Sequence, residues 1–134
     1  MERLFAKKID SLDAIFDYIT QFADANKVNP EITRKLHFGV EEVFTNMVRY
    51  NTESANDVAI GLQIDNGQFL ISIVDRDVHS YDPTKRPPVD IAQPLHERTP
   101  GGLGIHLVRE MMDDVRYEYD GRTVTITLIK RLER

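Results

Sequence analysis

The chain has 134 residues, of which 41% are hydrophobic and 29% charged, a composition typical of a folded domain rather than a disordered segment. It contains no cysteine, which excludes disulfides, thiolate metal sites and a cysteine nucleophile, and its formal net charge of −5 argues against broad binding to a nucleic-acid backbone. No apolar run is long enough to span a membrane and the first residues lack the pattern of a signal peptide, so we expect a cytoplasmic protein with a single domain over residues 1–134.

The first helix is predicted over residues 8–27, where apolar side chains recur at spacings of three and four and form one stripe. Either Asp10 or Ser11 can cap its start, since both side chains accept hydrogen bonds from backbone N–H groups. Residues 2–8, just before this helix, are expected to form a short strand at the edge of a sheet.

A second, longer helix is predicted from the segment Asn29-Pro30-Glu31 to about Asn51, because proline and an acidic residue both favour the first turn. Glu42 and Asn46 are four residues apart and therefore share one face of this helix, beside the apolar stripe, where both should be half-buried. They can form a hydrogen-bonded pair with a purely structural role. Alternatively, Asn46 can hold a metal ion through its amide oxygen while Glu42 takes up a proton.

The hydrophobic period changes to two from Val58 to Ile73, with Asn66-Gly67 at its centre, which predicts a hairpin with a tight turn. Asp75 follows at the end of the second strand. Its carboxylate can accept a hydrogen bond from an amino group such as that of adenine, or it can cap the following turn. The local sequence leaves these two interpretations equally open.

Residues 76–100 contain five of the six prolines and form the only long irregular stretch, which is typical of a functional lid, although a surface insertion without a role remains an alternative. The glycine-rich segment Gly101–Gly104 follows and opens a short helix that runs through Met112. Backbone N–H groups at such a helix start can bind phosphate. The same glycines can also serve only to turn the chain.

A second hairpin closes the chain between Val115 and Leu128, with its turn at Asp120-Gly121. The order of elements is therefore helix, helix, hairpin, lid, helix, hairpin. This order predicts an α+β fold, a two-layer sandwich in which helices cover one face of a mixed or antiparallel sheet of four strands.

Four features follow one another along the chain: an asparagine on a helix, an aspartate that ends a hairpin strand, a proline-rich loop, and a glycine loop that opens the next helix. This order resembles the Bergerat-fold (GHKL, histidine-kinase-like) ATPases. The resemblance covers nearly the whole chain and is closest to the branch of anti-sigma-factor serine kinases. The strings that carry it are Glu42-Val43-Phe44-Thr45-Asn46, Tyr81-Asp82-Pro83, Gly101-Gly102-Leu103-Gly104-Ile105-His106-Leu107-Val108 and Met112-Asp113-Asp114-Val115-Arg116-Tyr117.

This resemblance implies an ATP- and Mg²⁺-dependent protein-serine/threonine kinase that phosphorylates a small antagonist protein of the anti-anti-sigma (STAS) type. A sigma factor is a further implied partner, and a homodimer is possible, whereas neither nucleic acid nor a membrane is expected to bind directly. Glu42 would be the general base, Asn46 the Mg²⁺ ligand and Asp75 the acceptor for the adenine amino group. The implied nucleotide site also includes Tyr50, Asp77, Tyr81, Gly101, Gly102, Leu103 and Gly104.

Asp77 stands where the adenine motif of this family has a glycine, and the interval from Asp75 to Tyr81 is one residue longer than usual. A side chain at this position hinders close approach of the base, and its carboxylate repels a polyanionic ligand. The alternative is therefore a degenerate ATPase that acts as a partner switch through protein–protein contacts without nucleotide.

Overall fold

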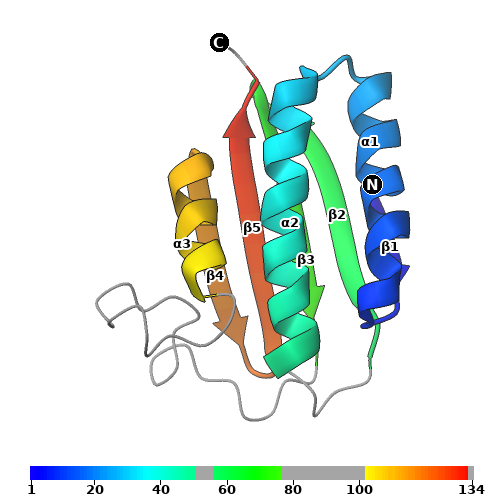
Figure 1. The fold of residues 1–134 in the computed structure, drawn as a ribbon, viewed down its shortest axis with the longest axis vertical. Helices are drawn as coiled ribbons and strands as arrows, with labels where there is room; N and C mark the ends of the chain where they lie inside the picture. Colours follow the sequence, from blue (N-terminus) through cyan, green and yellow to red (C-terminus); the bar gives the residue numbers. More distant parts are fainter. Residues whose placement is uncertain (51–55, 77–101, 133–134) are drawn as a thin grey trace.

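The computed structural model describes residues 1–50, 56–76 and 102–132. Within these ranges the chain forms five strands, one short 3-10 helix and three α-helices (Figure 1). In chain order the elements are β1 (Glu2–Phe5), η1 (Ile9–Ser11), α1 (Leu12–Ala25), α2 (Pro30–Tyr50), β2 (Val58–Asp65), β3 (Gln68–Asp75), α3 (Gly102–Met111), β4 (Asp114–Asp120) and β5 (Thr123–Arg131).

The strands pair in the order β1-β2-β3-β5-β4, and each neighbouring pair is antiparallel. All three α-helices lie on one face of this sheet (Figure 1). The predicted two-layer α+β sandwich is therefore confirmed, with an antiparallel rather than a mixed sheet. The fifth strand is the expected edge strand, which ends at Phe5 and is shorter than the predicted 2–8.

The start of α1 differs from the prediction. Ser11 occupies the N-cap position, but neither it nor any other side chain caps the helix there. Instead the Ser11 hydroxyl donates a hydrogen bond to the carbonyl oxygen of Ala6 at 2.7 Å. The turn η1 continues directly into α1, so the cap position already has helical backbone angles and the hydroxyl fixes the preceding loop instead. At the other end α1 stops at Ala25, because Lys27 has a left-handed φ of 58°.

The start of α2 follows the predicted chemistry. The side-chain oxygen of Asn29 accepts a hydrogen bond from the backbone N–H of Glu31 at 2.8 Å, and Pro30 is the first helical residue. Further along, Gly39 lies so close to β5 that a Cβ atom there would come within 2.9 Å of a Leu128 methyl group. This glycine lets the middle of α2 approach the sheet closely.

The first hairpin has the predicted geometry, since Asn66 and Gly67 have φ angles of 52° and 74°. In β3 every second side chain is buried, in agreement with the predicted alternation. These side chains face the helices and join one continuous core with apolar residues of α1 and α2. The fully buried members of β3 are Phe69, Ile71, Ile73 and Asp75.

Candidate functional site

Three of the elements singled out by the sequence meet at one end of the molecule. The last turns of α2, the end of β3 and the first turn of α3 all lie at the lower end of the view in Figure 1. Glu42 and Asn46 come from α2, Asp75 is the last residue of β3, and Gly102 is the first residue of α3. Residues far apart in the sequence are therefore gathered by the fold at one end of the sheet.

Glu42 and Asn46 are both half-buried on α2, as their position beside the apolar stripe predicted. Burial raises the pKa of the Glu42 carboxyl above its usual value, and the neighbouring Glu41 carboxylate raises it further, while Arg49 partly opposes both. A carboxylate with a raised pKa holds a proton more readily than an exposed glutamate does.

Asp75 is completely buried, with 0% of its side chain exposed. Its carboxylate oxygen Oδ1 lies 2.9 Å from the ammonium nitrogen of Lys7, whose side chain is only 5% exposed. The alternation of β3 turns Asp75 toward the helices rather than toward solvent. Neither of the two interpretations of Asp75 drawn from the sequence included this ion pair.

The strand register explains why Lys7 meets Asp75. Phe5 of β1 lies opposite Val58 of β2, and Val74 of β3 lies opposite Ala59. Because β1 and β3 are both antiparallel to β2, they run in the same direction, and their C-terminal residues lie at the same end of the sheet. The residues that follow each strand therefore come together, one strand apart.

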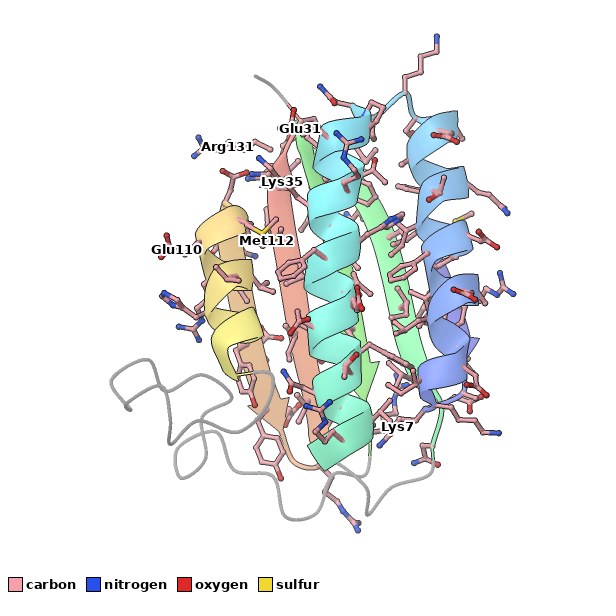
Figure 2. The ribbon with its side chains drawn as sticks, in the orientation of Figure 1. Lys7, Glu31, Lys35, Glu110, Met112 and Arg131 are labelled. Atoms are coloured by element: carbon pink, nitrogen blue, oxygen red, sulfur yellow. The ribbon has the colours of Figure 1, made fainter. Side chains whose placement is uncertain are left out.

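Lys7 is held in this position by the loop on either side of it. The carbonyl oxygen of Ala6 accepts hydrogen bonds from the backbone N–H of Lys8 at 2.8 Å and from the Ser11 hydroxyl at 2.7 Å. Figure 2 shows Lys7 beside the lower end of α2, the end of the molecule at which β3 stops. A lysine near the end of the edge strand predicted over residues 2–8 was the available signal, and its meaning depended on a register that the sequence does not reveal.

The glycine segment is only partly within the described residues. Gly102, Leu103 and Gly104 form the first turn of α3, so the helix starts three residues earlier than a start after Gly104 would place it. The predicted site residues Asp77, Tyr81 and Gly101 lie outside the described residues, as does most of the predicted lid. Tyr50 is the last residue of α2.

The donor groups on α2 are compatible with a magnesium ion. Mg²⁺ prefers oxygen ligands, and in nucleotide sites it takes only one or two protein ligands, with water and phosphate oxygens completing its shell. Asn46 is half-buried one turn after Glu42, and its amide oxygen is a donor of the type that Mg²⁺ prefers. No cluster of three or more His, Asp or Glu side chains suited to a metal occurs in the described part of the chain, so a metal caged by protein ligands alone finds no support there.

Comparison with known proteins identifies the family. Residues 5–130 match the family described as the histidine kinase-like ATPase domain. The chain belongs to this family. The match extends from the last residue of β1 to Lys130, the last residue but one of β5, and so includes Lys7 as well as the residues of α2, β3 and α3 described above.

Curated relatives of this chain are named serine-protein kinases. Those named RsbW from Bacillus cereus (strain AH820) and Bacillus anthracis (strain A0248) are each 30% identical to this chain over 98 residues. The aligned region covers 69% of this chain and 61% of each relative. The chain thus spans about three fifths of the length of the relatives that it matches.

Two solved structures share the histidine kinase-like ATPase fold. The structure of the RsbU and RsbW domains of Rv1364c from Mycobacterium tuberculosis matches 98% of this chain and 31% of its own with a TM-score of 0.70 and 12% identity. The Acinetobacter baumannii histidine kinase AdeS matches 100% of this chain and 68% of its own with a TM-score of 0.59 and 11% identity. At such identities the likeness shows the fold alone. Among the described residues, no helix is both long and apolar enough to cross a membrane.

Proposed function

We propose that this chain is an ATP-binding protein-serine kinase of the anti-sigma-factor type, with residues 1–134 forming one ATPase domain that acts in the cytoplasm. The observation that carries the proposal is that the last turns of α2, the end of β3 and the start of α3 lie at one end of the sheet (Figure 1), in a chain of the histidine kinase-like ATPase family. Glu42 and Asn46 belong to α2, Asp75 ends β3 and Gly102 begins α3. The relatives named serine-protein kinase support the choice of serine as phosphoryl acceptor. The proposed substrate is a small antagonist protein of the STAS type, and a sigma factor is a second partner.

The proposed roles follow from the chemistry of each side chain. Asn46 would hold Mg²⁺ through its amide oxygen, and the bound ion supplies neutralisation of the phosphate charge during transfer. Glu42 accepts the proton of the serine hydroxyl, a task for which its raised pKa suits it. Gly102 and Gly104 lie in the first turn of α3, where unpaired backbone N–H groups and the helix dipole favour a phosphate. Asp75 accepts a hydrogen bond from the adenine amino group.

One observation favours the alternative function, a partner switch that works without nucleotide. The acceptor assigned to adenine is fully buried and already carries the ammonium group of Lys7. A buried ion pair at this position satisfies Asp75 in the absence of any ligand. In this alternative function, the protein still binds its partner proteins through its surface, while the residues of the nucleotide site only stabilise the fold.

Thermal unfolding with Mg-ATP and Mg-ADP separates the two functions. A ligand present at about one hundred times its dissociation constant stabilises the folded state by about 2.7 kcal/mol, which raises the melting temperature by several degrees for a domain of this size. We expect such a shift for the native sequence. The absence of any shift at millimolar nucleotide contradicts the kinase and supports the partner switch.

The Asn46→Ala variant tests the metal assignment within the same experiment. Removing the amide oxygen should abolish the stabilisation by Mg-ATP while leaving the unliganded protein folded, since Asn46 is only half-buried. Thr45→Ala, a change at another half-buried polar residue of α2, is the matched control and should keep the shift. A shift that persists in Asn46→Ala shows that another group holds the metal.

A further inference from the structure

The ion pair between Lys7 and Asp75 joins two parts of the chain that the proposed reaction does not otherwise connect. Lys7 belongs to the loop between β1 and η1, whereas Asp75 ends β3. Their contact of 2.9 Å is made between side chains that are 5% and 0% exposed. Because two charges removed from water each lose several kcal/mol of hydration, such a pair persists only when the partners compensate one another closely.

The position of this pair bears directly on nucleotide binding. Asp75 is the residue assigned to the amino group of the base, so Lys7 and the base need the same carboxylate. The ammonium of Lys7 adds the attraction between two full charges to its contact with the carboxylate, whereas the amino group of a base is a neutral donor. The base therefore offers Asp75 a weaker partner than the one it already has.

We propose that Lys7 determines the nucleotide affinity of this protein by occupying the base-binding carboxylate of Asp75, so that a purine nucleotide binds only as Lys7 leaves. The inference rests on the proposed function, because it takes the nucleotide site and the role of Asp75 from it. The contacts of the phosphates supply the free energy that displaces Lys7. By linkage, nucleotide binding and release of Lys7 favour one another.

The loop geometry makes Lys7 specific among the nearby lysines. Lys8 is the next residue and is exposed, while the backbone around both is fixed by the hydrogen bonds to the Ala6 carbonyl oxygen. Lys7 and Lys8 thus share one loop, one charge and one side-chain length, and differ in burial and in the contact with Asp75. Lys8 is a matched internal control for any measurement made on Lys7.

Chemical labelling of the native protein tests the proposal without any mutation. An amine-acylating reagent is applied with and without Mg-ADP, and the modification of each lysine is measured by mass spectrometry. We expect Lys7 to be slowly acylated in the free protein and several-fold faster once Mg-ADP is bound, while Lys8 reacts equally in both. If Mg-ADP binds, as thermal unfolding reports, and Lys7 remains as protected as before, the inference is wrong while the proposed nucleotide site stands.

Substitution gives the second test. Lys7→Met removes the competing ammonium but keeps the length of the side chain, and should bind Mg-ADP about tenfold or more tightly than the native protein in a calorimetric titration. Lys7→Arg keeps the charge and can form a two-point contact with the carboxylate, so it should bind no more tightly than the native protein. Lys8→Met should leave the affinity unchanged.

The outcomes separate the two proposals. Tighter binding by Lys7→Met than by the native protein, with measurable binding by both, confirms the role of Lys7. Equal or weaker binding by Lys7→Met contradicts it. If neither the native protein nor a folded Lys7→Met binds nucleotide, the proposed function fails and the inference fails with it. Should Lys7→Met not fold, Lys7→Gln, which can still donate a hydrogen bond to Asp75, replaces it with the same expected direction.

Discussion

The two sides of the candidate site are built in different ways. Glu42 and Asn46 are half-exposed residues of one helix, and their relation to each other is fixed by the helical repeat alone. Asp75 is fully buried, and its environment is set by Lys7, which is 68 positions away in the sequence and reaches it through the pairing of β1, β2 and β3. The chemistry of the first side is local, whereas that of the second side depends on tertiary structure.

Among the predicted effects of substitutions, we expect the largest on stability, at the buried residue Asp75. Asp75→Ala leaves the ammonium of Lys7 buried without its carboxylate, which should cost about 3–5 kcal/mol in the free energy of unfolding. Urea unfolding at neutral pH measures the loss. The exposed pair between Arg116 and Asp114 provides the control, since its side chains are 62% and 54% exposed and 3.4 Å apart.

The control should behave quite differently. Asp114→Ala should cost less than about 1 kcal/mol, because water already solvates both charges of an exposed pair. Replacing both buried partners, in Lys7→Met/Asp75→Leu, should recover most of the stability lost in Asp75→Ala. Equal losses for Asp75→Ala and Asp114→Ala contradict the distinction between a buried and an exposed ion pair.

The next largest effect is expected on the rate of phosphoryl transfer, from a substitution at Glu42 on α2. Glu42→Gln removes the proposed general base and should lower the rate of phosphoryl transfer by about 10²–10⁴-fold. The measurement is ADP formation from Mg-ATP in the presence of a serine-containing antagonist protein of the STAS type. The stabilisation by Mg-ADP should be retained, because Glu42 is assigned no contact with the nucleotide.

The neighbouring glutamate supplies the comparison for this activity. Glu41 is exposed on the same helix and is assigned no role in transfer, so Glu41→Gln should retain the activity within a few-fold. A similar loss of activity in both variants shows that negative charge on this part of α2 matters, rather than a proton acceptor at Glu42.

The same contrast between local and tertiary structure explains what the sequence could predict. The hairpin turn at Asn66-Gly67, the extent of α2 and the half-buried position of Asn46 follow from short-range patterns, and the structure confirms them. The prediction that Ser11 caps the first helix was wrong, because its hydroxyl donates a hydrogen bond to the preceding loop instead. Lys7 was missed since its partner is set by strand register across β2, which local periodicity does not reveal.

The smallest effect is the pH dependence that Glu42 contributes to stability. Burial, followed by repulsion from Glu41, raises the pKa of Glu42 in the folded state above its usual value of 4.5. The folded state therefore holds this proton more tightly than the unfolded state does. The resulting stabilisation is fully present below the unfolded pKa and is lost as the pH rises through the higher folded pKa.

Glu42→Gln removes this titration, because glutamine stays neutral at all pH values. The free energy of unfolding of the variant minus that of the native protein should be larger at pH 7 than at pH 4, by a few tenths of a kcal/mol. The effect is small because solvent surrounds the half-buried carboxyl. Urea midpoints at the two pH values measure the difference. In a Glu41→Gln background the difference should shrink, because Glu41 supplies the second cause of the raised pKa. If the variant and the native protein differ in stability by the same amount at both pH values, the difference comes from packing and not from titration. Glu42 would then lack the raised pKa that suits it to accept a proton.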